Sequence, residues 1–134
     1  MSKFALVDTN ILLRFFTGEP PALADRARDL IQQADSGKLQ LEIPSVIVAE
    51  TVYTLDSFYE MPKGEVCEKL LVFLRSRGIA PQEPEIILNA LERYRDLTVH
   101  FADAYLAASA SVKKLAVYSF DQDFAKFKDL DWKQ

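Results

Sequence analysis

Residues 4–10 read Phe-Ala-Leu-Val-Asp-Thr-Asn, an apolar run that stops abruptly at Asp8. Short continuous apolar runs are typical of strands that are buried on both faces of a parallel sheet, so we predict a strand over residues 4–7. Asp8, Thr9 or Asn10 is suited to cap a helix that begins directly after this strand. The stretch therefore predicts a buried strand followed at once by a helix.

Strands and helices alternate along the rest of the chain. A second strongly apolar run predicts a strand over residues 115–118, and residues 39–43 alternate apolar and polar side chains as a strand does. This alternation predicts an α/β fold, a three-layer α/β/α arrangement with a central, mainly parallel sheet flanked by helices. We expect residues 1–134 to form a single domain. The further elements expected are a strand at 79–81, an edge strand near Trp132, a helical turn after Asp123, and helices over 22–34, 45–58, 62–78, 84–94 and 102–112.

The composition narrows the class of protein. The 134 residues include 16 basic and 20 acidic side chains, so the net charge is −4. This balance argues against binding nucleic acid by bulk positive charge, but an enzyme that meets phosphate through metal ions remains compatible with it. Cys67 is the only cysteine, which excludes an internal disulfide, and its helical neighbours predict a core position. We find no apolar segment long enough for a membrane span or a secretory signal and therefore expect a cytoplasmic protein.

Four acidic residues lie outside the charged, evidently exposed stretches that hold most of the acids. Asp8 and Asp121 follow the two strongly apolar strands, at the edge of a parallel sheet where reactive sites lie. Glu50 and Asp103 are the only charged residues in two apolar helical stretches, with no Lys or Arg within helical reach. A buried carboxylate without a partner is costly, so the compensating charge must come from a distant base or a metal. Grouped carboxylate oxygens suit Mg²⁺ or Mn²⁺.

Each of these acids also has a purely structural interpretation. Asp8 could serve simply as a helix cap, and Asp103 could cap the N-terminus of the Ala-rich helix. Glu50 could lie on an exposed helix face, and Asp121 or Asp123 could be a turn residue. The predicted sheet brings the ends of its strands together. A coincidence of all four structural interpretations is therefore less favoured than a shared acidic site.

The order and spacing of the acidic motifs resemble the PIN domain family, ribonucleases that include the VapC toxins. The resemblance covers essentially the whole chain, and its motifs come in the family's order. The stretches that carry it are Val7-Asp8-Thr9-Asn10, Pro44-Ser-Val-Ile-Val-Ala-Glu50, Phe101-Ala-Asp103-Ala and Tyr118-Ser119-Phe-Asp121-Gln-Asp123-Phe124.

The resemblance implies a role for each matching residue. Some would form the catalytic acidic centre, some of these would bind the metal directly, and others would hold the bound cofactor by auxiliary contacts or hydrogen bonds. The implied catalytic residues are Asp8, Glu50, Asp103 and Asp121; the metal ligands are Asp8, Asp103 and Asp121; the cofactor-binding residues are Thr9, Asn10, Ser119 and Asp123.

The function implied by the resemblance is a metal-dependent endoribonuclease that hydrolyses RNA phosphodiester bonds with Mg²⁺ or Mn²⁺. Many relatives of this length are toxins of type II toxin–antitoxin pairs. The resemblance therefore also implies a cognate antitoxin protein and a homodimer, with no membrane partner. Phe15 and Phe16 could form an apolar patch for such an interface, or could belong to the core.

Two other functions stay open at this point. An aspartate-based phosphomonoester phosphatase also places its nucleophile after the first strand, but that chemistry generally needs a second Asp two positions later, where this chain has Asn10. A non-catalytic RNA-binding or protein-binding module could keep the acidic pocket without cutting. Activity on a chromogenic phosphate monoester, and RNA binding without turnover, would identify these two alternatives.

Histidine and aromatic residues near the acids have two interpretations each. His100, the sole histidine, could shuttle protons, although we favour a structural or surface role. Phe120, Phe124 and Phe127 could stack on bases, but their spacing of four and three is helical and favours core packing.

Overall fold

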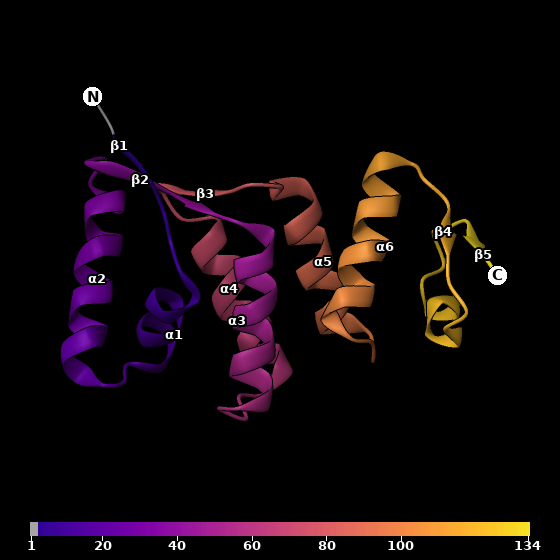
Figure 1. Cartoon of the computed structure of the whole chain (residues 1–134), viewed down its shortest axis with the longest axis horizontal. Coiled ribbons are helices and arrows are strands. Elements are labelled where there is room, and N and C mark those ends of the chain that lie inside the picture. Colours follow the sequence, from indigo (N-terminus) through magenta and orange to yellow (C-terminus); the bar gives the residue numbers. More distant parts are fainter. Residues whose placement is uncertain (1–2) are drawn as a thin grey trace. The chain divides into compact units, whose positions relative to one another are not determined.

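The computed structural model describes residues 3–134 (Figure 1). The chain forms two compact units, Met1–Glu83 and Pro84–Gln134, which we call the N-terminal unit and the C-terminal unit. Each unit contains parallel strands and helices of its own, and each is described here in turn.

A three-stranded parallel sheet organises the N-terminal unit. Its strands are β1 (Lys3–Leu6), β2 (Leu39–Ile43) and β3 (Ile79–Pro81), in the order β1-β2-β3. Because all three strands run in the same direction, their carboxyl ends meet at one edge of the sheet. Asp8 and the start of the helix after β2 lie beyond that edge.

Four helices accompany this sheet: α1 (Thr9–Thr17), α2 (Pro21–Asp35), α3 (Ser45–Ser57) and α4 (Lys63–Leu74). Helix α1 packs against α2 and α3, and α3 packs against α4. Their inward faces bury branched apolar side chains, which provide most of the driving force for folding. Cys67 is fully buried on α4, which confirms its predicted core position.

The turn between α4 and β3 brings two backbone segments into close contact. Gly78 has a left-handed φ of +81°, and a Cβ atom at this position would overlap the backbone carbonyl of Ala34 at the end of α2. Only glycine combines this backbone conformation with such a close approach. Gly78 therefore fixes where β3 enters the sheet.

Phe15 and Phe16 take part in an aromatic cluster within the N-terminal unit. Both rings are half-buried and pack on Phe73 of α4, with ring centroids 5.7 and 5.5 Å from it. Such edge and tilted contacts are favourable for aromatic pairs. The cluster favours the core interpretation of these two residues over the exposed patch.

The C-terminal unit consists of α5 (Pro84–Asp96), α6 (Phe101–Lys113), β4 (Val117–Tyr118), the 3₁₀ helix η1 (Gln122–Lys126) and β5 (Trp132–Lys133). Helices α5 and α6 lie side by side (Figure 1). Their close packing follows from buried alanines on α6, which let the two backbones approach each other. Strands β4 and β5 pair in parallel, with Val117 opposite Trp132.

The predicted α/β class, with parallel strands and flanking helices, is confirmed. The strand expected at 115–118 is two residues shorter, because Lys114 ends α6 in a left-handed conformation and the Leu115 N–H still bonds to the Ala110 carbonyl at 2.9 Å. Pairing with β5 therefore begins only at Val117. Across residues 3–134 we find no helix with the length and apolar character that a membrane crossing requires.

Candidate metal centre

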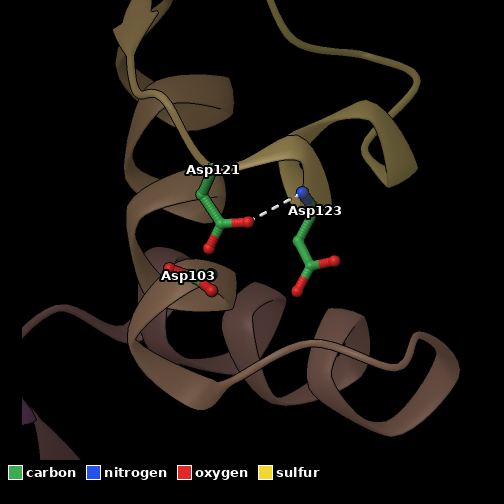
Figure 2. Close-up of side chains that lie close together, drawn as sticks. All are labelled: Asp103, Asp121 and Asp123. Carbon is green, nitrogen blue, oxygen red and sulfur yellow. Dashed lines mark hydrogen bonds between the residues drawn. The ribbon is translucent and has the colours of Figure 1, made fainter.

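Three carboxylates gather in the C-terminal unit. Asp103, Asp121 and Asp123 each offer an oxygen atom, and these three oxygens all lie within 4.8 Å of one another. Figure 2 shows Asp121 and Asp123 at the start of η1, with Asp103 on the neighbouring helix α6. We call these residues the Asp triad.

Helix α6 places Asp103 in its first turn. The free N–H groups and the dipole at a helix N-terminus stabilise a carboxylate there. The N-cap position belongs to His100, whose side chain makes no capping hydrogen bond. Asp103 is therefore not the cap residue of this helix, and its half-buried side chain is left for the triad.

Asp121 and Asp123 are held by a tight local turn after β4. The Asp123 N–H donates to the Asp121 carboxylate at 2.9 Å, which makes Asp121 the cap of η1 (Figure 2). The Asp121 N–H in turn donates to the Ser119 hydroxyl oxygen at 3.0 Å. Ser119 thus fixes the backbone that carries both acids.

The surroundings of Asp103 alter its acidity. Burial raises the pKa of the Asp103 carboxyl above its ordinary value of 3.8; the charge of Asp121 raises this pKa further, the charge of His100 opposes the increase, and the charge of Asp123 adds to it. Ionisation of the Asp103 carboxyl is therefore less favourable than that of a free aspartate, and a nearby cation would offset this.

The donor set fits a divalent ion. Oxygens that bind one Mg²⁺ at roughly 2.1 Å lie within about 4.2 Å of one another, and the triad oxygens already approach within 4.8 Å. All three donors are hard carboxylate oxygens, which Mg²⁺ and Mn²⁺ prefer over softer ligands. The residues present could hold such an ion after small side-chain movements.

Arg93 and Asp129 form the centre of a hydrogen-bond network in the C-terminal unit. Arg93 of α5 donates to both carboxylate oxygens of Asp129, at 2.8 and 2.5 Å, and to the Asn89 side-chain oxygen at 2.6 Å. Ser111 of α6 donates to the same Asp129 carboxylate at 3.0 Å, and the Arg93 guanidinium lies 5.8 Å from the centre of the Phe127 ring. These hydrogen bonds, led by those from Arg93, lower the pKa of Asp129 to about 2. The network joins α5, α6 and the segment after η1.

Among the predicted residues of the N-terminal unit, Asp8, Thr9 and Asn10 follow β1, whereas Glu50 lies within α3. Asp8 caps α1, and its carboxylate accepts from the Thr9 N–H at 2.8 Å. Thr9 is 4% exposed, and its hydroxyl oxygen has no hydrogen-bond partner among residues 3–134. Asn10 and Glu50 are exposed, in α1 and α3 respectively. Asp8 thus caps a helix and Glu50 lies on an exposed helix face, as the purely structural interpretations describe. Both side chains remain exposed to solvent.

The aromatic residues after β4 divide into two groups. Phe124 and Phe127 are buried with their ring centroids 5.5 Å apart, which confirms core packing for both. Phe120 is 88% exposed, so core packing is wrong for this residue. The reason is that η1 begins only at Gln122, so Phe120 lies outside the helix that its spacing suggested.

Sequence reasoning missed the basic residues around the triad. Lys126 forms an ion pair with Asp123 at 3.1 Å, and its position three residues later in a helical segment was a usable signal. The pairing of Arg93 with Asp129 spans 36 residues and leaves no local signal in one sequence.

One family of known proteins matches almost the whole chain. The model described as PIN domain covers residues 5–130. Among solved structures, VapBC2 from Rickettsia felis bound to a DNA fragment from their promoter is similar over 97% of each chain, with 18% sequence identity and a TM-score of 0.41. No curated protein matches the chain. The family match confirms the expected fold class, PIN-like three-layer α/β/α.

Proposed function

The chain belongs to the PIN domain family, whose members are generally nucleases, and from this premise we propose that it is a metal-dependent endoribonuclease. The observation that carries the proposal is the Asp triad, whose carboxylate oxygens lie within 4.8 Å of one another. Hydrolysis of an RNA phosphodiester needs a site that compensates negative charge, and a carboxylate group of this kind can hold the cation that does so.

The chain's own residues have separate tasks in this proposal. Asp103, Asp121 and Asp123 would hold Mg²⁺ or Mn²⁺, and Ser119 orients the turn that carries two of them. When bound, the ion supplies Lewis acidity that activates water and stabilises charge on the phosphate oxygens. Asp103 lies in the first turn of α6, where the helix N-terminus favours its carboxylate form, and from there it would help to hold the ion.

Further residues are proposed on the resemblance of their motifs. Asp8 is proposed as another metal ligand and Glu50 as another catalytic acid. Thr9 and Asn10 are proposed to orient bound groups, and the buried Thr9 hydroxyl without a partner among the described residues supports such a role. An unsatisfied buried hydroxyl is costly, so a bound group that accepts or donates there would be favourable.

Cleavage of RNA by the purified protein tests the proposal. We expect cutting of unstructured RNA with Mg²⁺ or Mn²⁺, none with EDTA, and losses on the order of 100-fold or more for Asp8→Asn, Glu50→Gln, Asp103→Asn and Asp121→Asn. The control is Glu60→Gln, an exposed loop residue, which should cut normally. Because residues of one metal site act together, a double variant should be little worse than either single variant. Full activity of Asp103→Asn would refute the proposed centre.

The same preparation separates the two alternatives. A phosphatase would hydrolyse a chromogenic phosphate monoester faster than it cuts RNA, and a binding module would retain RNA without turnover in Mn²⁺. The PIN family match favours the nuclease over both.

We also propose that the enzyme acts in the cytoplasm as the toxin of a type II toxin–antitoxin pair, as a homodimer with a separate antitoxin chain. The motif resemblance and the length of 134 residues support this. Growth arrest on expression, relieved by a short neighbouring gene product, is the expected result. Sedimentation that shows a strict monomer at tens of micromolar would remove the homodimer from the proposal.

A further inference from the structure

Lys126 contacts the Asp triad from within η1. Its ammonium nitrogen lies 3.1 Å from a carboxylate oxygen of Asp123 and donates to the Thr98 carbonyl at 2.7 Å. Thr98 lies in the connection between α5 and α6, so the ammonium is held from two sides. An exposed ion pair gains little, because holding two long side chains in one geometry costs conformational entropy. The Thr98 carbonyl is a second partner that helps to hold the Lys126 side chain beside Asp123.

The charges at this position are nearly balanced for one divalent cation. Three ionised carboxylates carry −3 and the Lys126 ammonium carries +1, which leaves −2. A divalent ion bound to the triad would stand close to the ammonium, and the two positive charges would repel each other. Asp123 would therefore have to divide its interaction between the ion and Lys126.

We propose that Lys126 is a resident cation of the triad that competes with the divalent ion for Asp123 and thereby weakens metal binding. This inference rests on the proposed function, because it assumes that the triad holds a metal ion. In the absence of metal, Lys126 reduces the repulsion among the three carboxylates. The affinity for metal then depends on how much more strongly the carboxylates interact with the divalent ion than with the Lys126 ammonium.

Calorimetric titration of Mn²⁺ into the full chain, without RNA, tests this inference. We expect Lys126→Met to bind Mn²⁺ about threefold to tenfold more tightly than the wild type, because a repelling charge is removed. Lys126→Arg keeps the charge and should stay near the wild type. The difference between Lys126→Met and the wild type should shrink at high salt, since the pair is partly exposed.

Two further variants isolate the interaction with Asp123. Lys128→Met removes the same charge two residues further along the chain, where the Lys128 ammonium donates to the Ala125 carbonyl at 3.0 Å. The metal affinity of this variant should change less than that of Lys126→Met. In an Asp123→Asn background, Lys126→Met should have little further effect on affinity, because the shared partner is gone. A purely structural role of Lys126 would instead lower the melting temperature equally with and without Mn²⁺.

The outcomes separate this inference from the proposed function. A wild type that binds Mn²⁺ while Lys126→Met binds it equally or more weakly overturns the competition and leaves the nuclease proposal intact. A wild type that binds neither Mn²⁺ nor Mg²⁺ overturns both. Tighter binding by Lys126→Met, with Lys126→Arg near the wild type, supports the competition.

Discussion

Asp8 in the N-terminal unit and Asp121 in the C-terminal unit occupy the same local position, since each follows a parallel strand and caps the helix after it. Their surroundings differ. Asp121 has two carboxylate neighbours within its own unit, whereas Asp8 belongs to no group of three such ligands among the described residues of the N-terminal unit. The comparison shows that a capped acid after a strand is a structural feature by itself, and that the added carboxylates turn it into a candidate cation site.

The units also differ in one local constraint on their backbone. The N-terminal unit contains the close backbone approach of Gly78 to Ala34, which tolerates no side chain. The C-terminal unit contains the charged network of Arg93 and Asp129, which responds to pH. Steric and electrostatic constraints should therefore fail under different conditions, and four measurements test this contrast.

The largest effect is expected for Gly78→Ala. The new Cβ would overlap the Ala34 carbonyl in a left-handed backbone, so we expect a loss of about 3 kcal/mol of unfolding free energy, or roughly 10 °C in melting temperature. The matched control is Gly64→Ala in α4, where a Cβ meets no atom within 4 Å, and it should stabilise by about 0.5–1 kcal/mol. Equal effects of the two changes in chemical denaturation would contradict the steric account.

Metal binding gives the next largest effect and compares the two aspartates directly. At free Mn²⁺ about fifty-fold above its dissociation constant, the folded wild type should gain about 2.3 kcal/mol. Asp121→Asn should remove most of this gain, because it removes a member of the triad. Asp8→Asn should only blunt it, in line with the role that we propose for Asp8 on its motif resemblance. Thermal melting with and without Mn²⁺ measures both, and an undiminished gain in Asp121→Asn would break the comparison.

Acid should loosen the network of the C-terminal unit. The pKa of Asp129 is lowered to about 2 in the folded protein, so its contribution is fully present above its ordinary value of 3.8 and is lost as pH falls toward 2. Because the Asp129 side chain is 50% exposed, we expect only about 1 kcal/mol. Asp129→Asn should lose a similar amount at pH 7, whereas Asp131→Asn, with only a 3.9 Å pair to Lys133, should change little.

The smallest effect concerns Asp103 without metal. Its pKa is raised, so ionisation disfavours the folded state above the folded pKa, and this cost disappears as pH falls through that pKa toward 3.8. Asp103→Asn should therefore be slightly more stable than the metal-free wild type at pH 7, and equal to it in mild acid. Greater stability of the metal-free wild type at pH 7 would mean that ionised Asp103 does not destabilise the folded protein.

Most of the fold could be predicted from local sequence. The strand at 79–81 and the helix start at Pro84 agree with the structure because glycine and proline mark their boundaries. Only backbone geometry at Lys114 explains why β4 starts late.

Less of the candidate site could be predicted. Asp103 stands out in sequence as the only charge in its apolar stretch, Asp121 stands out because it follows an apolar strand, and the structure brings these two together. Asp123 was expected only as an auxiliary residue, since its place beside Asp103 depends on the tertiary contact between η1 and α6. The Ser45 hydroxyl donates to Glu83, 38 residues away, at 2.6 Å, and local spacing does not reveal a contact of this kind.

Trp132 makes the end of the chain a natural optical reporter. It is the only tryptophan, it is half-buried in β5, and its indole N–H donates to the Ser119 carbonyl at 2.9 Å. All tryptophan fluorescence therefore originates from an indole in β5 that is hydrogen-bonded to Ser119, two residues before Asp121. A change in hydrogen bonding at Ser119 would alter the polarity sensed by the indole, so its emission wavelength can follow this turn without any added label.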